Sequence, residues 1–236
     1  MRFQPSKCNI ITFARKKNPV NFDYVLNDVK LVKVDSIKYL GVTISNDLNW
    51  DKHIQSICNK GNKILGILYR NLSFCSRDVK LAAYKGLLRP VLEYACCVWD
   101  PHQSYLQDKL ESIQRRSARF VSSEFSREPG SMTSILKDLD LPTLADRRKQ
   151  NRLFLFSKGF FGKANIPMDK LSHPTRKTRG MHNLHFCQLY SRSNCYKFSF
   201  LPSTLKDWNN LPAALIDGLD SHRDPVQFIT NFIRAN

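Results

Sequence analysis

The first fifty residues alternate short β-rich runs with turn-forming residues. The runs cover residues 10–13, 24–26, 29–34 and 39–44, and the Asn27-Asp28 pair marks a turn between the second and third runs. Runs of β-branched and aromatic residues bounded by turn signals predict three or four antiparallel strands. A sheet this small buries too little surface to be stable alone. It therefore requires a second layer, either the following helices or a missing segment.

After Trp50 the apolar positions follow the period of an α-helix. A helical projection that starts at Lys52 places seven apolar side chains within about 60° of one direction. They are Ile54, Ile57, Cys58, Ile64, Leu65, Leu68 and Leu72. The opposite side carries the basic residues Lys52, Lys60, Lys63 and Arg70. This stretch predicts a long amphipathic helix with a basic outer face.

Two more helical runs come next. The second run starts after Ser76, a residue type favoured at helix N-caps, and reaches Arg89, where Pro90 should break or kink the helix. The apolar stretch 91–99 is expected to be buried. A third helix over 103–124 has an apolar face opposite Arg115 and Arg119, made of Leu106, Leu110, Ile113, Ser117 and Val121. Three helices with short connections predict a compact bundle.

The next part of the chain contains a linker signal and two shorter helical runs. Residues 128–131 combine glutamate, proline, glycine and serine and separate the bundle from the C-terminal half of the chain. A short helix is expected near 132–138. Another helix is expected to begin at Thr143, because Asp146 stands at the spacing of a capping box.

The C-terminal part is mostly irregular. Residues 162–196 carry scattered proline, glycine and basic residues and are expected to form loops. Structure returns in 198–202 and 208–212, and residues 228–233 are amphipathic. The predicted fold class is α+β and mostly helical, with a small antiparallel β segment, a three-helix bundle and a loop-rich C-terminal region.

Charge narrows the class of partner. The chain has 37 Lys and Arg against 20 Asp and Glu, and the resulting net charge of +17 is spread evenly along the sequence. No apolar run reaches the length of a membrane span, so no membrane partner is signalled. Distributed positive charge favours nucleic acid as the partner, although some ribosome-associated and lipid-binding proteins share it.

The cysteines indicate an intracellular protein and no metal centre. There are seven cysteines without any C-x-x-C pair, which is typical of reduced thiols. The N-terminus lacks the apolar core of a signal peptide, and the sequence does not distinguish nucleus from cytoplasm. One metal-like grouping exists, but its spacing matches no common zinc pattern. It consists of His182, His185, Cys187 and Cys195.

Several short motifs, each present once, follow one another in a characteristic order along the chain. The motifs before the linker are FQPSKC at 3–8, KYLGVTI at 38–44, LNWDKHI at 48–54, RPVLEY at 89–94, VWDP at 98–101 and LESIQRR at 110–116. Those after it are LADRR at 144–148, SFLP at 199–202 and WNNLP at 208–212. Together they resemble the end of non-LTR retrotransposon (LINE) reverse transcriptases, of the jockey-like and chicken-repeat-like kind. The resemblance covers nearly the whole chain and begins just after the catalytic aspartates.

The resemblance implies an RNA-directed DNA polymerase whose chemistry lies outside this chain. Enzymes of this family present an aromatic-Ala-Asp-Asp turn and a further aspartate, which hold two Mg²⁺ ions. This sequence contains no Asp-Asp pair, and the isolated Asp23 and Asp28 fit turn positions. We therefore expect no cofactor in this chain, with Mg²⁺ belonging to the missing palm, and no polymerase activity from the chain alone.

The resemblance also divides the chain into four parts. Residues 1–50 correspond to the palm edge, and Lys38, Tyr39, Leu40 and Gly41 resemble the primer-grip hairpin. Residues 51–127 correspond to the thumb, 128–161 to a helical extension, and 162–236 to a loop-rich basic C-terminal region. Without the resemblance, an ordinary strand with a glycine kink is the favoured interpretation of these residues.

Three basic groups are candidates for contacts with phosphates. They are the helix stripe Lys52, Lys60, Lys63 and Arg70; the set Arg115, Arg116 and Arg119; and the set Arg147, Arg148 and Arg152. Each group has the alternative of a solvated helix face. Near the third group, Phe154, Phe156 and Phe160 either stack on bases or belong to the core.

Two functions fit the sequence. The first is a reverse-transcriptase fragment that holds an RNA–DNA template–primer duplex, or other nucleic acid, next to the missing palm and fingers. The second is a non-catalytic, domesticated or decayed nucleic-acid-binding or interaction protein. Neither function involves a small-molecule substrate.

Overall fold

The computed structural model describes residues 3–14, 16, 20, 22–126, 128–176, 178, 181–213 and 216. Its strands are β1 (Asn9–Ile10), β2 (Val25–Leu26), β3 (Val29–Lys30), β4 (Val32–Lys33), β5 (Ser36–Tyr39) and β6 (Val42–Ser45). Its α-helices are α1 (Asp51–Leu72), α2 (Arg77–Ala83), α3 (Arg89–Glu93), α4 (Cys96–Trp99), α5 (Ser104–Ser122), α6 (Ser131–Asp138), α7 (Leu144–Phe160), α8 (Asn194–Lys197) and α9 (Phe200–Asn209). The fold is α+β and mostly helical, as predicted.

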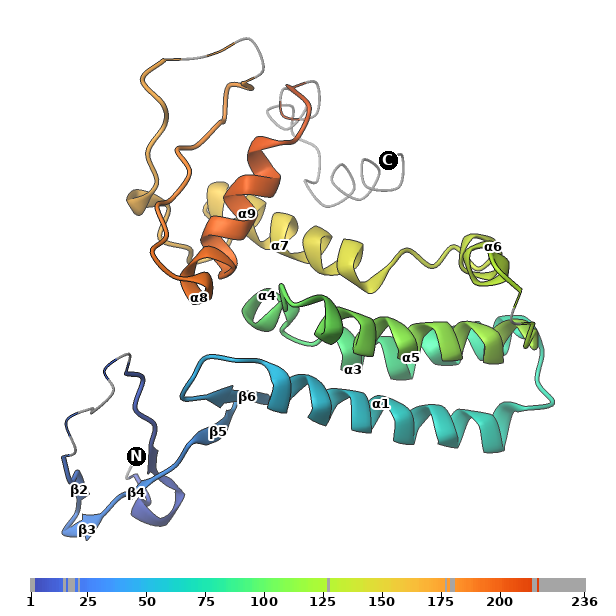
Figure 1. Ribbon diagram of the computed structural model, residues 1–236, viewed down its shortest axis with the longest axis horizontal. Coiled ribbons are helices and arrows are strands. Elements are labelled where there is room, and N and C mark those ends of the chain that lie inside the picture. Colours follow the sequence, from blue (N-terminus) through green and yellow to red (C-terminus); the bar gives the residue numbers. More distant parts are fainter. Residues whose placement is uncertain are drawn as a thin grey trace.

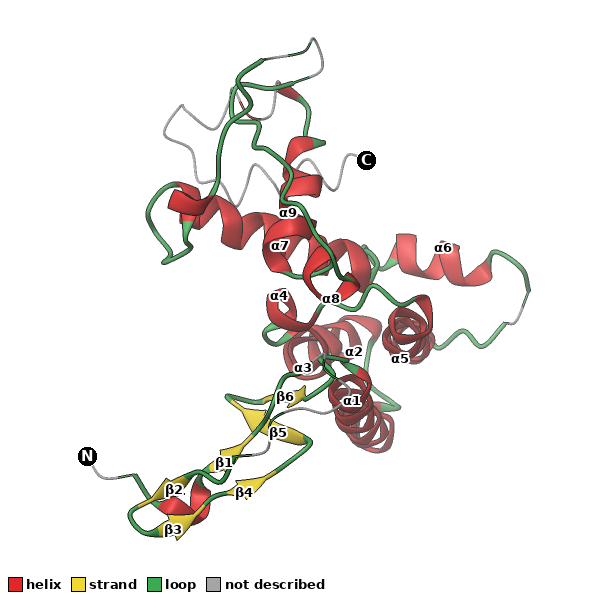
Figure 2. Ribbon diagram, turned by 60° about the vertical axis from the view of Figure 1, so that its left-hand side comes forward, coloured by secondary structure: helices red, strands yellow, loops and turns green. Residues whose placement is uncertain are grey.

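The elements are arranged in three levels. The short strands lie at one end, helices α1 to α5 form the middle, and α7, α8 and α9 lie over the middle level on the side away from the strands (Figure 1, Figure 2). Within the described ranges, no helix is both long enough and apolar enough to cross a membrane.

The strands form three separate pairs, so the prediction of one antiparallel set is wrong in part. β2 with β3 and β5 with β6 are antiparallel, but β1 pairs with β4 in parallel. The turn at Asn27 and Asp28 is confirmed, since both residues have positive φ, as a two-residue hairpin requires. The pairs do not merge into one sheet because β1 to β4 are only two residues long.

The β5–β6 hairpin is attached to the helices. Val42 in β6 is buried in the core of the bundle, and Ile44 packs against the same core. By contrast, Val25, Val29 and Val32 of the other pairs are exposed. The second layer expected from the sequence is therefore supplied to β5–β6 by α1, while Val25, Val29 and Val32 stay exposed among the described residues and Leu26 of β2 is half-buried.

Helix α1 has the amphipathic pattern that the sequence predicts. All seven predicted apolar residues are buried in the core or packed against it. Gly61 lies on the same face, where a Cβ atom would be 3.2 Å from Leu92 and 3.4 Å from Ile113. The missing side chain therefore lets α1 approach α3 and α5 closely.

The prediction that the second helical run reaches Arg89 and breaks at Pro90 is wrong in part, because the α-helix is interrupted earlier and α3 continues through Pro90 to Glu93. A π-helical turn, Tyr84–Leu88, separates α2 from α3. Pro90 then occupies the first turn of α3, where its missing N–H has no helical partner to lose. Ser76 is the N-cap residue of α2, but its side chain makes no capping hydrogen bond.

The expectation that residues 91–99 are buried is only partly correct. Leu92, Cys96 and Trp99 are buried, whereas Tyr94 is 59% exposed and Val98 is 57% exposed. The cause is the backbone, because Ala95 adopts a left-handed conformation between α3 and α4. The stretch therefore forms two short helical turns, each with an outer side, and not one buried segment.

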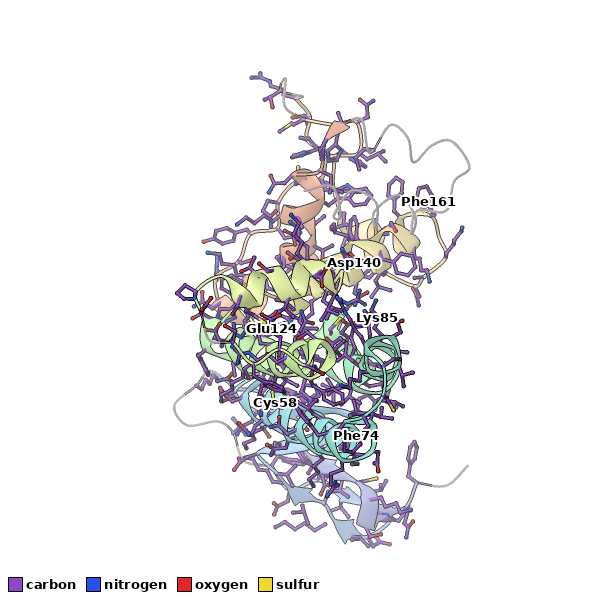
Figure 3. The ribbon with its side chains drawn as sticks, turned by 90° about the vertical axis from the view of Figure 1, so that its right-hand side faces the viewer. Cys58, Phe74, Lys85, Glu124, Asp140 and Phe161 are labelled. Atoms are coloured by element: carbon purple, nitrogen blue, oxygen red, sulfur yellow. The ribbon has the colours of Figure 1, made fainter. Side chains whose placement is uncertain are left out.

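Helix α5 runs parallel to α1 and completes the bundle. Tyr105 bonds to Asp51 and Arg116 bonds to Asn62, so both contacts join residues 54 positions apart. A constant offset of this kind requires two helices that point in the same direction. The predicted apolar face of α5 is buried as expected. Figure 3 views this bundle from the end that carries Phe74, with Cys58 in its interior.

Helix α7 joins two hydrophobic cores. Its predicted N-cap is present, since the Thr143 hydroxyl oxygen accepts the Asp146 N–H at 3.0 Å and the hydroxyl donates to the Asp146 carboxylate at 2.6 Å. Leu144 belongs to the core of the bundle, while Leu153 and Phe156 belong to a second core with Trp208 of α9. The expected helix near 132–138 is α6. The expected amphipathic run 228–233 lies outside the described residues.

The loop-rich C-terminal part is held to α9 by side chains that bond its backbone. The Trp208 indole N–H donates to the carbonyl of Leu184 at 2.9 Å. The Asn209 amide accepts the N–H of Phe186 and donates to its carbonyl. This irregular segment therefore has a defined path without regular secondary structure.

His53 connects β6 to α1. Its Nδ1 atom accepts the backbone N–H of Thr43 at 3.2 Å, and its ring packs edge-on against Trp99. Burial and, secondly, the charge of Lys60 lower the pKa of His53 from 6.5 to about 4. His53 is therefore neutral at pH 7, which its role as a hydrogen-bond acceptor requires.

The lowered pKa predicts a loss of stability in mild acid. Between pH 6.5 and pH 4 the unfolded chain binds a proton at His53 that the folded chain does not, so stability falls as pH falls through this window. We expect the free energy of unfolding, measured in urea, to be about 2 kcal/mol lower at pH 5 than at pH 7 from this residue. His53→Gln should be less stable at pH 7 but should lack this decrement. An equal decrement in both proteins would contradict the assignment.

Candidate nucleic-acid interface

The outer face of α1 is basic and lacks acidic partners. Lys52, Lys60, Lys63 and Arg70 are all exposed, and among the described residues none of them forms an ion pair. The single acidic residue of α1 is Asp51, whose carboxylate accepts the Tyr105 hydroxyl at 2.8 Å. At 1.5 Å per residue, the stripe extends over about 27 Å.

Part of the second basic group lies beside this face. The Arg116 guanidinium donates to the Asn62 side chain at 2.6 Å, which places Arg116 next to α1. Arg119 is partly buried near Tyr69, whose ring contacts Phe120. Burial raises the pKa of Tyr69, and the charges of Arg116 and Arg119 oppose that rise. Arg115 lies on the exposed face of α5.

The predicted primer-grip residues form the turn between β5 and β6. Leu40 and Gly41 both have positive φ, so the glycine lies in a two-residue turn and not within a strand. The Tyr94 hydroxyl donates to the carbonyl of Leu40 at 3.1 Å. A Cβ atom on Gly41 would lie 3.0 Å from the Tyr94 ring, so only glycine fits closely here. Lys38 and Tyr39 precede the turn, and Tyr39 is exposed.

Two arginines of the third group are paired with carboxylates of the bundle. Arg147 forms a bidentate contact with Glu93 of α3. The side chain of Arg148 is 0% exposed, and its Nε atom lies 2.6 Å from Asp100 at the end of α4. The prediction that Arg148 contacts a phosphate is therefore corrected, because a fully buried guanidinium cannot reach a phosphate in this conformation.

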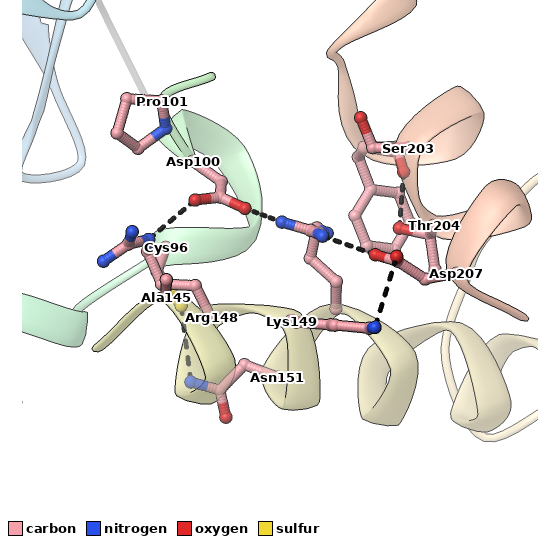
Figure 4. A network of polar contacts seen from close by, with 12 residues as sticks. Cys96, Asp100, Pro101, Ala145, Arg148, Lys149, Asn151, Ser203, Thr204 and Asp207 are labelled. Carbon is pink, nitrogen blue, oxygen red and sulfur yellow. Dashed lines mark hydrogen bonds and ion pairs between the residues drawn. The ribbon is translucent and has the colours of Figure 1, made fainter. Parts of the chain in front are cut away.

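Arg152 continues the same polar network into α9. It contacts Asp100 on one side and Asp207 on the other, the latter at 2.7 Å, and Lys149 lies 3.6 Å from Asp207 (Figure 4). Its side chain is almost buried. The prediction that Arg152 is a phosphate ligand is therefore corrected as well, because Arg152 links α4, α7 and α9. Sequence analysis missed Asp100 and Asp207, since nothing in the linear pattern shows that they converge.

The aromatic residues near this group belong mainly to the second core. Phe156 is fully buried, with its ring centroid 5.1 Å from that of Trp208. Phe160 packs against the same core. Phe154 lies beneath the ammonium group of Lys158 at 4.2 Å. The core alternative therefore holds for Phe156 and Phe160.

The metal-like grouping is not gathered into a site. Across the described part of the chain, no three histidine, cysteine or acidic side chains converge to hold a metal ion. Cys187 and Cys195 are exposed thiols. The Nε2 atom of His182 lies 3.1 Å from the carbonyl oxygen of Trp208, so this ring takes part in packing the C-terminal segment.

Comparison with known proteins gives a distant relative. A Drosophila melanogaster protein, described as a probable RNA-directed DNA polymerase from transposon X-element, is 28% identical over 146 residues. The match covers 60% of this chain but 16% of that protein. No family model matches the chain, and no solved structure matches it. The similarity supports a region related to a retrotransposon reverse transcriptase within this chain.

Removing the central carboxylate of the polar network should destabilise the fold strongly. In Asp100→Asn, the buried Arg148 loses its charged partner, and breaking a buried ion pair costs about 3–5 kcal/mol. We expect a fall of that size in the free energy of unfolding, measured by urea denaturation at pH 7.

The matched control is Asp138→Asn. Asp138 pairs with Arg77 at 2.5 Å, but the two side chains are 69% and 46% exposed. Exposed pairs contribute less than about 1 kcal/mol. Equal losses of unfolding free energy in the two variants would show that the Asp100 network stabilises the fold no more than an exposed ion pair does.

Proposed function

We propose that this chain is the nucleic-acid-holding part of a LINE-type reverse transcriptase and that it binds an RNA–DNA duplex along α1 and α5. The supporting observation is the outer face of α1, where four exposed basic residues have no carboxylate partner among the described residues. The similarity to a transposon polymerase indicates the class of ligand.

The contrast between α1 and α7 gives this observation its weight. On α7, three arginines are matched by Glu93, Asp100 and Asp207. On α1, four basic residues follow one face and the helix has one acidic residue at its start. A chain that pairs the arginines of one helix with carboxylates and leaves the basic residues of another unpaired retains an electrostatic surface suited to phosphates.

The remaining parts fit the same proposal. The Leu40–Gly41 turn, clamped by Tyr94, is the proposed primer grip, and the parts 1–50 and 51–127 are the proposed palm edge and thumb. The exposed valines of β2, β3 and β4 suit contact with a missing palm, which would also hold the Mg²⁺ ions. The alternative, a non-catalytic binding protein, is favoured by one observation, the lack of an Asp-Asp pair.

Binding should depend on the lysines of α1. In Lys60→Gln with Lys63→Gln, two exposed charges are removed and helix propensity changes little. The plot of log affinity for an RNA–DNA hybrid against log salt should become shallower by about 1.8, with similar losses on unrelated sequences. Fluorescence anisotropy over a salt series measures this.

The control removes two other exposed lysines, Lys163 and Lys170, which lie after α7 in the chain. Lys163→Gln with Lys170→Gln has the same net charge as the test variant and should keep the wild-type slope. If the control variant lowers the salt slope as much as the test variant does, the α1 lysines contribute only through the total charge of the chain.

The purified chain should not extend a primer. Without paired aspartates to hold two metal ions, phosphoryl transfer lacks its main electrostatic stabilisation. We expect no extension of a primed RNA template with Mg²⁺ and nucleotides beyond a protein-free control. Extension above the protein-free control that survives repurification would refute the proposed division of labour.

A further inference from the structure

A cavity of about 750 Å³ lies beside the polar network, on the C-terminal side of the molecule. Its walls come from the irregular segment 188–191, from the end of α8, from α9 and from Arg152 of α7. This volume is within the usual range for sites that hold a small ligand or a nucleotide unit. None of the candidate residues on α1 or α5 lines it.

The charge of the cavity is positive. Arg152 and Asp207 line it but are paired with each other at 2.7 Å. Lys197 and Lys206 also line it, both exposed and without a carboxylate partner among the residues that the structure describes. The cavity thus offers two ammonium groups to an anionic ligand.

One of the two aromatic residues that line the cavity makes no ring contact with the described residues. Phe198 already stacks on His102, with centroids 4.0 Å apart, and the Lys197 ammonium lies 5.5 Å from the Phe198 centroid. Tyr190 is 82% exposed, and no ring contact involves it among the described residues. Tyr190 therefore presents an aromatic face next to two cations.

We infer that this cavity binds one nucleotide of an unpaired nucleic-acid strand, with the base stacked on Tyr190 and the flanking phosphates on Lys197 and Lys206. An exposed aromatic platform next to backbone-contacting cations is the combination by which proteins hold single strands. A base within a duplex is stacked on its neighbours and cannot use such a platform. The site is separate from the proposed duplex surface and does not rest on it.

The walls of this site are held in place by contacts already described. Arg152 and Asp207 fix α9 against α7 and the Asp100 carboxylate. The Gln188 side chain donates to the carbonyl of Pro202 at 2.8 Å, which ties the segment that carries Tyr190 to α9. The segment that carries Tyr190 is therefore tied to α9, which carries Lys206.

The test measures binding of labelled oligo(dT) and of an RNA–DNA hybrid to the full chain. Tyr190→Ala should weaken oligo(dT) binding about fivefold or more and leave hybrid binding unchanged. Lys197→Gln with Lys206→Gln should make the salt plot for oligo(dT) shallower by about 1.4. Unchanged oligo(dT) binding in both variants, or equal losses for both ligands, would overturn the inference.

Matched controls separate this site from general effects. Tyr196→Ala removes another exposed tyrosine that does not line the cavity, and Lys163→Gln with Lys170→Gln removes two exposed lysines that do not line it either. Both should bind oligo(dT) as the wild type does. Lys60→Gln with Lys63→Gln should weaken hybrid binding and keep most oligo(dT) binding, so failure of the duplex proposal is recognised separately.

A competition arm identifies the source of the nucleotide. Adenosine monophosphate, at a concentration matching the nucleotide units of the oligo(dT), should displace little of it, because it has no flanking phosphate for the second lysine. Full displacement would assign the cavity to a free nucleotide and would overturn its assignment to an unpaired strand.

Discussion

The carboxylate of Asp100, set between two almost completely buried guanidinium groups, is the interaction on which the rest of the structure depends. It ends α4, contacts Arg148 and Arg152 on α7, and through Arg152 is connected to Asp207 on α9. Helix α7 contributes Leu144 to one hydrophobic core and Leu153 and Phe156 to the other, so this network, together with the stacking of His102 on Phe198, holds the bundle against the C-terminal part. A buried charge is costly without a partner, so the contact with Asp100 restricts how α7 can lie against the end of α4.

This constraint also decides which basic residues remain available. The arginines of α7 are used inside the protein, whereas the basic residues of α1 and the lysines of the C-terminal cavity are not. A net charge of +17 on one chain causes self-repulsion unless an anionic partner binds. The distribution of ion pairs, and not the total charge, therefore distinguishes the surfaces that suit a phosphate backbone from the segments that merely contain arginine.

The sequence predicts well what depends on local pattern. Helices α1 and α5, the N-cap at Thr143 and the turn at Asn27 and Asp28 result from residue period and turn chemistry alone. It fails where the outcome depends on partners distant in the chain. Arg148 looks like a surface residue until Asp100, 48 positions away, is seen beside it. The exposure of Tyr94 likewise depends on the backbone of Ala95 and on a hydrogen bond to Leu40, and no local pattern encodes either.

The least satisfied part of the structure is the hairpin tip and the strands before it. Leu40 is 75% exposed and has positive φ, which is unfavourable for a branched apolar side chain on both counts. The parallel pair β1–β4 is mostly exposed, although parallel strands are normally covered on both faces. Local preference and fold disagree here more than anywhere in the bundle, and such disagreement is expected where a surface is shaped for contact with another molecule. The Tyr94 hydroxyl, at the end of α3, donates to the Leu40 carbonyl and so joins this tip to α3. A molecule that binds Leu40 therefore contacts a turn that is directly bonded to the bundle.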